Sequence, residues 1–337
     1  MIIPINLGKQ SYNIILERGA LNNAFSYLRL DRRVLIVTDS GVPKKYAEAI
    51  KSQSKDAIIY IIKEGEESKN INNYMELLKT LVENKFTRTD CVVAVGGGVC
   101  GDLAGFVAST YMRGIDFYNV PTTLLSQVDS SIGGKVAVDF YGVKNIVGAF
   151  YQPKAVLIDP EVLTTLDKRQ LHAGLCESIK MAATSDRELF QLIEKSTNLE
   201  DDLDEIIYKS LLIKKDVVEK DPNEKGLRKV LNFGHTIGHA IEGAYNLNGY
   251  LHGECVGMGM LYMCSDSVKA RLKSILEKYK IPMAEKISEK ELIKYISVDK
   301  KANGSKITII YVESLGSFEM RDIEINDICD YINGGAK

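Results

Sequence analysis

The sequence lacks the features that mark several large classes of protein. Its 43 Lys and Arg residues are balanced by 45 Asp and Glu residues, and the formal net charge of −2 leaves no basic stripe of the kind that binds nucleic acid. No apolar run approaches the ~20 residues that cross a bilayer. The first ten residues, MIIPINLGKQ, lack the basic and apolar regions of a signal peptide. We therefore expect a cytoplasmic protein with neither a membrane nor a nucleic-acid partner.

The sequence also lacks closely spaced pairs of cysteines. The six cysteines include no CxxC pair, and dispersed thiols in a chain of this length are typical of reduced, buried residues. A hydrophobic fraction of 45% excludes intrinsic disorder, and 337 residues favour two domains.

Histidine is scarce, with four in the chain, yet His235, His239 and His252 lie within eighteen residues. That cluster is a candidate functional site.

The first half of the chain alternates short apolar runs with helical segments. Four β-branched runs are each followed by turn-forming residues: 34–38, 57–62, 91–95 and 117–120. They lack the in/out alternation of a half-exposed strand, which indicates a parallel sheet covered on both faces. Residues 71–84 carry apolar side chains at helical spacing. We therefore predict an α/β domain with a Rossmann-like parallel sheet over residues 1–150.

The pattern changes after one further apolar run, 155–159. Helical periodicity continues almost without interruption from about 168 to 296, with clear segments at 202–220, 229–245 and 254–279. A short β pair, 307–312 with 317–323, is joined at Leu315-Gly316. The second domain, residues 151–337, is therefore predicted to be mainly α-helical.

A glycine-rich turn follows the run at 91–95. Gly96–Gly101 satisfies GxGxxG before a helix expected to start near residue 100. Backbone without side chains lets a pyrophosphate approach a helix N-terminus, although a plain βα turn gives the same pattern. Asp39 ends an earlier strand, where a carboxylate can reach a ribose hydroxyl, and Thr122-Thr123 follow another strand at the same edge. The positions of Asp39, Thr122 and Thr123 favour a dinucleotide site over a plain βα turn.

The histidine cluster has the spacing of a metal site. His235 and His239 are four residues apart in a helical pattern and share one face, while Gly253 after His252 indicates close packing. Three imidazoles suit Zn²⁺, and hydrogen-bonded structural histidines fit the same pattern. A carboxylate would instead complete a His/His/Glu site. Glu177 is the candidate because it lies on a helix face of small residues.

Cationic residues flank these motifs. Each fits a solvated surface charge when taken singly, but together they suggest a pocket for a phosphate or carboxylate group. They are Arg113, Lys135, Lys144, Lys180, Lys214, Arg228 and the pair Lys300-Lys301.

The motifs occur, in this order, in one known family. They are GGGVCGDLAGF (96–106), YMRG (111–114), PTTLLSQVDSSIGGK (121–135), KNIVGAFYQPKAVLIDP (144–160), AGLCESIK (173–180), LRKVLNFGHTIGHAIE (227–242), HGE (252–254) and DKK (299–301). On these residues the chain resembles the 3-dehydroquinate synthases, a family of sugar-phosphate cyclases, over nearly its whole length. The departures are Cys176 and Ser178 beside Glu177, which leave the local packing open, and Val136-Ala137 after Lys135.

The resemblance implies two cofactors and a set of residues for each. Zn²⁺, or Co²⁺, would be bound by Glu177, His235 and His252, with His239 assigned to the substrate pocket. NAD would contact Asp39, Glu66, Lys69, Gly97, Gly98, Val99, Cys100, Gly101, Asp102, Thr122, Thr123, Lys135, Lys144, Thr164 and Thr165. The substrate would contact Arg113, Asp129, Lys135, Asn145, Lys180, Lys214, Arg228, Asn232, His239 and one of Lys300 and Lys301, of which Lys300 is favoured.

The resemblance also implies an activity. It is that of a phosphate-eliminating carbon–oxygen lyase of the shikimate pathway, which converts 3-deoxy-D-arabino-heptulosonate 7-phosphate to 3-dehydroquinate and phosphate. A homodimer and an active site between the two domains are expected. The alternatives are a cyclase acting on sedoheptulose 7-phosphate or glucose 6-phosphate, a metal-dependent polyol dehydrogenase and, more distantly, a non-enzymatic metal- or nucleotide-binding protein. Arg228 and the segments SSIGGK and KNIVGAF favour a carboxylate-bearing substrate.

Overall fold

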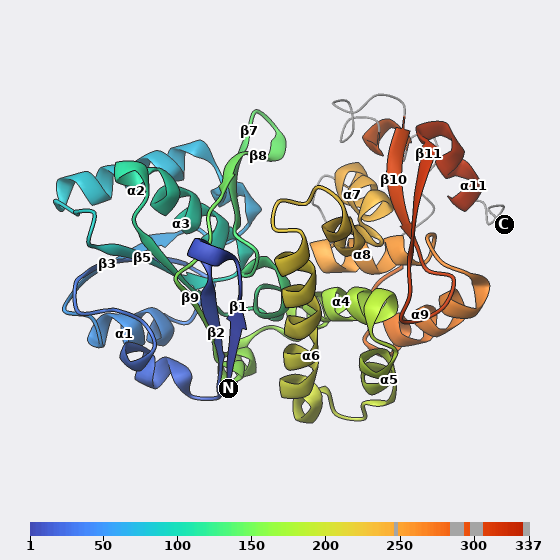
Figure 1. The fold of residues 1–337 in the computed structure, drawn as a ribbon, viewed down its shortest axis with the longest axis horizontal. Helices are drawn as coiled ribbons and strands as arrows, with labels where there is room; N and C mark the ends of the chain where they lie inside the picture. Colours follow the sequence, from blue (N-terminus) through green and yellow to red (C-terminus); the bar gives the residue numbers. More distant parts are fainter. Residues whose placement is uncertain (246–248, 284–292, 297–305, 333–337) are drawn as a thin grey trace. The chain divides into compact units, whose positions relative to one another are not determined.

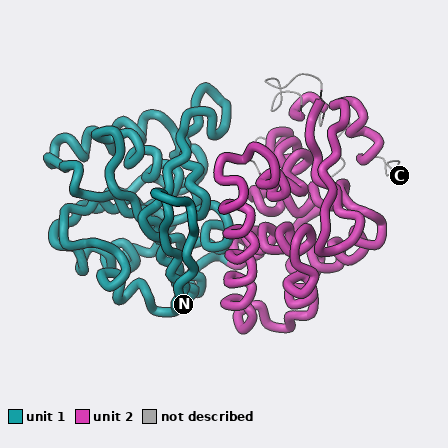
Figure 2. The backbone as a smooth tube through the Cα atoms, viewed as in Figure 1, with its two compact units in different colours: residues 1–167 teal, residues 168–337 magenta. Residues whose placement is uncertain are grey.

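The chain forms two compact units, residues 1–167 and 168–337 (Figure 2). The structure, a computed structural model, describes residues 1–245, 249–283, 293–296 and 306–332. The division falls after Asp167 and not near residue 150, because strand β9 (Ala155–Ile158) pairs with β2 and β6 inside the first unit's sheet. No helix in the described ranges is long and apolar enough to cross a membrane.

The first unit is built on a seven-stranded sheet (Figure 1). All neighbouring strands run parallel except β1, which is antiparallel to β2. The predicted parallel sheet is therefore confirmed, while β1 and β2 were not predicted. In spatial order the strands are β1 (Ile2–Ile5), β2 (Tyr12–Leu16), β9, β6 (Asp116–Pro121), β5 (Cys91–Gly96), β3 (Arg33–Asp39) and β4 (Asp56–Ile62).

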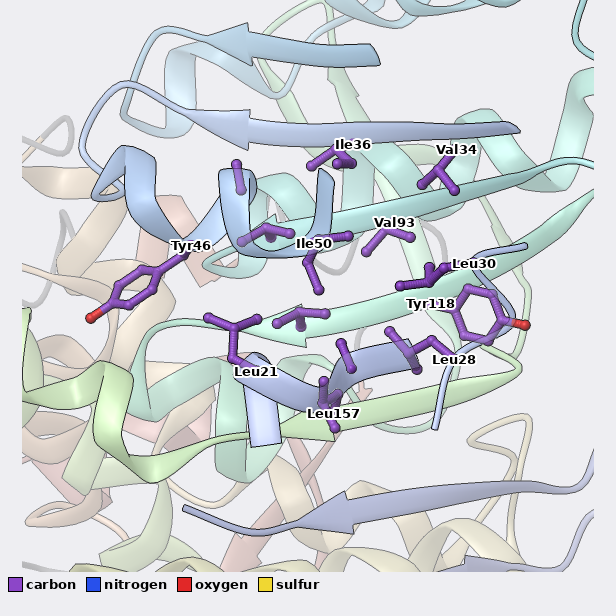
Figure 3. Close-up of a cluster of buried hydrophobic side chains, with 14 of the residues drawn as sticks. Leu21, Leu28, Leu30, Val34, Ile36, Tyr46, Ile50, Val93, Tyr118 and Leu157 are labelled. Atoms are coloured by element: carbon purple, nitrogen blue, oxygen red, sulfur yellow. The ribbon is translucent and has the colours of Figure 1, made fainter. Parts of the chain in front are cut away.

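Helical segments cover both faces of this sheet. On one face, α1 (Lys44–Ser52) and η2 (Ala20–Ser26) pack on Ile36, Tyr118 and Leu157 (Figure 3). On the other face, α2 (Ile71–Glu83) and α3 (Gly98–Thr110) pack on Val92 and Phe117. Every residue of β5 is buried, which explains why the central strands show no alternation of apolar and polar residues.

An antiparallel hairpin, β7 (Lys135–Phe140) with β8 (Val143–Phe150), belongs to the same unit and was not predicted. It packs on α3, where a Cβ atom on Gly105 would overlap Val136. Most residues of β8 are exposed, so its sequence carries little apolar signal. Short turns complete the unit: η1 (Gly8–Gln10), η3 (Glu66–Ser68), η4 (Tyr111–Arg113), η5 (Ser126–Ser130) and η6 (Pro160–Thr165).

The second unit is mainly helical, as predicted. Two of the expected helices are each interrupted: Gly234, with φ of 77°, separates η7 from α7, and Ser265 caps α9 after the end of α8. The predicted β pair is present as β10 and β11. The elements are α4 (Lys168–Ser185), α5 (Arg187–Lys195), α6 (Leu199–Lys220), η7 (Leu227–Asn232), α7 (His235–Ala244), α8 (His252–Met260), α9 (Asp266–Lys278), β10 (Lys306–Tyr311), β11 (Glu319–Glu324), η8 (Ile325–Asp327) and α11 (Ile328–Ile332).

Candidate active site

Three closely packed helices of the second unit bring the histidine cluster and Glu177 together. Glu177 lies on α4, His235 and His239 lie one turn apart on α7, and His252 begins α8. The helices approach closely because glycines lie at their contacts: a Cβ atom on Gly253 would overlap the Ala173 carbonyl group. The close packing expected at Gly253 is thus observed.

The ring nitrogens of His235 and His252 are oriented alike. Each Nε2 faces the same carboxylate oxygen, Glu177 Oε1, at 3.8 Å from His235 and 3.7 Å from His252. Each Nδ1 has an acceptor of its own. His235 Nδ1 lies 3.2 Å from the Phe233 carbonyl oxygen, and His252 Nδ1 lies 3.4 Å from Glu242 Oε2. With Nδ1 as the donor in both rings, both Nε2 lone pairs are directed at one point.

Glu177 has the properties of a metal ligand. Its side chain is 1% exposed, and neither oxygen accepts a hydrogen bond from the described residues, although Lys180 forms an ion pair with Oε2. A buried carboxylate without hydrogen bonds is costly unless a cation compensates it. Two imidazoles and a carboxylate are ligands that a divalent metal accepts, so these residues fit such an ion.

His239 lies close to the same point. Its ligating atom and those of His235 and His252 all lie within 4.8 Å of one another. A three-histidine set is therefore also compatible with the geometry. His239 differs from the other two because it is exposed, as suits a group that meets a substrate.

The surroundings displace the pKa values of the two oriented histidines in opposite directions. Desolvation and the Lys180 ammonium hold the pKa of His235 well below 6.5, which favours the neutral imidazole that binds metals. Desolvation also acts to lower the pKa of His252, but the hydrogen bond to Glu242 and the charges of Glu177 and Glu242 outweigh it and raise the pKa.

The two unusual residues beside Glu177 have ordinary packing roles. Ser178 accepts a hydrogen bond from Ser210 on α6 at 3.0 Å, and buried Cys176 lies next to Gly257 on α8. Neither side chain forms a hydrogen bond with an imidazole ring among the described residues.

The glycine-rich turn of the first unit has the geometry of an anion site. Gly97 directly precedes α3, and a Cβ atom on Gly96 would overlap the Cys100 side chain. Asp39 ends the neighbouring strand β3, accepting hydrogen bonds from the Gly41 backbone at 2.8 Å and from Cys100 Sγ at 3.2 Å. Backbone N–H groups at a helix start next to a carboxylate suit a dinucleotide.

Lys69 joins the turn to two other segments. Its ammonium lies 2.7 Å from Glu66 Oε1 and 3.3 Å from Asp102 Oδ2, and its backbone carbonyl accepts a hydrogen bond from Asp139 N. Desolvation raises the pKa of Asp102 to about 7, although Lys69 acts in the opposite direction. Among the predicted cofactor residues, Glu66, Lys69 and Asp102 are thus in direct contact.

Four of the other predicted cofactor residues follow strands β6 and β9 of the same sheet. Thr122 N donates a hydrogen bond to the Gly96 carbonyl at 2.9 Å, and Thr123 lies next to Gly97. Thr165 contacts Tyr46 at 2.9 Å. Thr164 and Thr165 are exposed in η6, after β9, and Val99 lies in the first turn of α3.

Comparisons with known proteins identify the family of the chain. Residues 59–173 match the family model for the N-terminal part of 3-dehydroquinate synthase, and residues 174–302 match the model for its C-terminal part. The chain is 39% identical, over 98% of both chains, to the 3-dehydroquinate synthase of Clostridium acetobutylicum. The chain belongs to the 3-dehydroquinate synthase family.

Solved structures of related cyclases share the fold of this 3-dehydroquinate synthase family member. One is a 2-deoxy-scyllo-inosose synthase with carbaglucose-6-phosphate, NAD⁺ and Co²⁺, at a TM-score of 0.88, 26% identity and coverage of 100% of both chains. Another is a 2-epi-5-epi-valiolone synthase from Streptomyces hygroscopicus with NAD⁺ and Zn²⁺. Its TM-score is 0.86 and its sequence identity is 25%, over 96% of both chains. The predicted fold class and the predicted activity of a phosphate-eliminating cyclase are confirmed.

The predicted substrate residues of the 3-dehydroquinate synthase family are divided between the units. In the second unit, Lys180 contacts Glu177, and His239 lies beside the other histidines. Buried Lys214 on α6 and buried Arg228 on η7 belong to the same unit, and Asn232 contacts Glu224 at 3.1 Å. The first unit holds Arg113, Asp129, Lys135 and Asn145, together with Lys144, which was predicted to contact NAD. Lys300 and Lys301 lie outside the described residues.

Three acidic residues at these sites were not among the predicted site residues. Glu242 contacts His252, Glu224 contacts Asn232, and Asp139 accepts a hydrogen bond from the Asn145 backbone at 2.8 Å. Only Glu242 had a signal in the sequence, because it lies seven residues after His235 and so on the same helix face. Nothing in the sequence pairs Asp139 with Asn145, which has φ of 54°.

Proposed function

We propose that this chain converts 3-deoxy-D-arabino-heptulosonate 7-phosphate to 3-dehydroquinate and phosphate, with NAD⁺ and one divalent metal ion as cofactors. The observation that carries the proposal is the convergence of His235 Nε2 and His252 Nε2 on Glu177 Oε1, in a chain 39% identical to a curated member of the family. The related cyclases with bound NAD⁺ and Co²⁺ or Zn²⁺ support both cofactors.

Glu177, His235 and His252 are the proposed metal ligands, and Zn²⁺ is the proposed ion because it readily takes two imidazoles and a carboxylate. A metal ion there supplies Lewis acidity, which acidifies the substrate hydroxyl that is oxidised. Lys180 neutralises the second oxygen of Glu177. Exposed His239 is proposed to orient a substrate hydroxyl or the phosphate, since it is one helical turn from His235.

The N-terminus of α3 is the proposed pyrophosphate site, and Asp39 is the proposed partner of a ribose. NAD⁺ supplies reversible hydride transfer when bound, so one molecule serves repeated turnovers. Glu66, Lys69 and Asp102 form an ion-paired group beside the glycines. The other proposed contacts are Gly97, Gly98, Val99, Cys100, Gly101, Thr122, Thr123, Lys135, Lys144, Thr164 and Thr165.

The chemistry of the substrate requires cations and a place for a leaving phosphate. Oxidation at C5 acidifies the C6 proton, phosphate leaves, the ketone is reduced again, the ring opens and an aldol step closes the carbocycle. Cationic side chains stabilise the departing phosphate. The C6 proton is assigned to the substrate's own phosphate and to no protein base. The proposed substrate residues are Arg113, Asp129, Lys135, Asn145, Lys180, Lys214, Arg228, Asn232, His239 and Lys300.

We further propose that the first unit, residues 1–167, binds NAD and that the second unit, residues 168–337, binds the metal ion. A cytoplasmic homodimer is the proposed form.

The rival substrates, glucose 6-phosphate and sedoheptulose 7-phosphate, lack a carboxylate. Identity is 39% to the dehydroquinate-forming relative but 26% and 25% to the two other cyclases, which favours the carboxylate-bearing substrate.

One assay tests this function. Purified protein is given 3-deoxy-D-arabino-heptulosonate 7-phosphate, with and without NAD⁺ and a metal chelator, and both phosphate and NADH are measured. We expect phosphate release that requires NAD⁺ and metal but leaves no net NADH. Stoichiometric NADH would instead indicate a polyol dehydrogenase. Phosphate release from glucose 6-phosphate or sedoheptulose 7-phosphate, but not from the heptulosonate, would indicate another cyclase.

A further inference from the structure

The proposed ligand His252 has a carboxylate behind its ring. Its Nε2 faces Glu177 Oε1 at 3.7 Å, while its Nδ1, on the opposite side of the ring, lies 3.4 Å from Glu242 Oε2. The Glu242 side chain is 8% exposed, whereas that of His252 is 35% exposed. Glu242 is therefore a largely buried carboxylate at the Nδ1 edge of the ring, and the Nε2 edge is directed at Glu177.

Glu242 comes from the helix that carries the other ligand histidine. It lies three residues after His239 and seven after His235 on α7, so all three share one face. His252 comes from α8, which packs on α7 with Gly238 against the Cys255 backbone. The contact between Glu242 and His252 thus fixes a ring on one helix relative to a ligand on the next.

The two ligand histidines are oriented by different means. The Nδ1 of His235 faces a backbone carbonyl, that of Phe233, which no side-chain substitution removes. The Nδ1 of His252 faces a carboxylate that can be replaced. A metal-binding histidine usually donates its other N–H to such an acceptor, which fixes the tautomer and makes the ring a stronger ligand.

We propose that Glu242 is a positioning residue for the metal site: it accepts the Nδ1–H of His252 and so holds the Nε2 lone pair toward Glu177 and His235. The proposal rests on the proposed function, because it assumes that His252 binds the metal. It assigns Glu242 no contact with the substrate. Its effect should be visible in metal binding before any turnover is measured.

The test compares full-length wild type with Glu242→Gln and, as a control, Glu194→Gln. The control removes a different carboxylate of the same unit, the partner of Arg271. Zn²⁺ affinity is measured by competition with a chromophoric chelator, and Co²⁺ is used as a spectroscopic probe. We expect Glu242→Gln to weaken Zn²⁺ binding about 10- to 100-fold and to alter the Co²⁺ spectrum. Glu194→Gln should leave both unchanged.

A second measurement needs no variant. In the metal-free wild type at about pH 9, well above the ordinary pKa of histidine, nitrogen-15 NMR of the rings should show His252 with its proton on Nδ1. A proton on Nε2 would overturn the proposal, even if Glu242→Gln does not fold. Zn²⁺ affinity within twofold of wild type in a folded Glu242→Gln would overturn it as well. Wild type that binds neither metal ion would refute the proposed function itself.

Discussion

Gly253, on α8, has its Cα directly against the carbonyl group of Ala173, on α4, with no room for a Cβ atom between them. The contact holds the helix that begins with His252 against the helix that carries Glu177. The distance between two proposed metal ligands therefore depends on one missing methyl group.

Gly253→Ala should consequently affect both folding and metal binding. Because the opposing atoms are backbone, they cannot rotate away, and we expect a loss of about 1–3 kcal/mol in the free energy of unfolding together with weaker Zn²⁺ binding. Urea denaturation and chelator competition measure the two effects. Gly257→Ala, on the same helix, is the matched control, because its new methyl group would meet the ends of the Cys176 and Leu276 side chains at 3.1 Å. Equal losses in both variants would contradict this explanation.

Substitution of the histidines separates the two possible ligand sets. We expect His235→Ala to lose both metal and turnover, since it removes one of the two Nε2 atoms that face Glu177 Oε1. His239→Ala should keep its metal and lose turnover by about 100-fold, the order of effect expected when a group that positions the substrate is removed. Metal analysis and phosphate-release rates provide the readout. Loss of metal in His239→Ala would favour the three-histidine site instead.

The sequence pattern predicted those parts of the fold whose signal is local. Continuous apolar runs indicated the central strands, and glycines before a helix indicated the turn at 96–101. The edge strand β1 and its neighbour β2 were not predicted. The hairpin β7–β8 was not predicted either, because β8 is largely exposed and has no apolar periodicity. The helix predicted over 229–245 is broken at Gly234, a left-handed residue that lies between η7 and α7.

The site could be predicted only in part for the same reason. His235 and His239 are four residues apart, so their shared face follows from helical geometry. Glu177 lies far away in the sequence: its helix face of small residues made it a candidate ligand, and the family resemblance implied its place in the ligand set. The contact between Asp139 and Asn145 depends on a hairpin and a left-handed residue that no periodicity reveals. Spacing predicts contacts within one element, whereas contacts between elements require the fold.

The turn before Arg228 should make stability depend on pH. Desolvation acts to raise the pKa of Asp221, but hydrogen bonds from the backbone N–H groups of Arg228, Lys225 and Gly226 hold it below 3.8. A carboxyl group with a lowered folded pKa stabilises the protein above its unfolded pKa, and this contribution disappears as the pH falls through the folded value. Asp221→Asn should cost about 1 kcal/mol at pH 7, and the difference from wild type should shrink below about pH 4. Urea midpoints across this range provide the measurement, and a constant difference would contradict the assignment.

Asp102 should show the opposite dependence. Desolvation raises its pKa from 3.8 to about 7, while Lys69 acts to lower it and Glu66 and Asp139 act to raise it. The folded protein therefore binds more protons than the unfolded chain between these values, and the free energy of unfolding falls as the pH rises through that window. Asp102→Asn removes the titrating group, so its stability should fall less than that of wild type over the same interval. Carbon-13 NMR of the carboxyl groups in cofactor-free protein should show one resonance that titrates near 7 and is missing from the variant. A carboxyl group that titrates near 4 would mean that Lys69 outweighs the desolvation of Asp102.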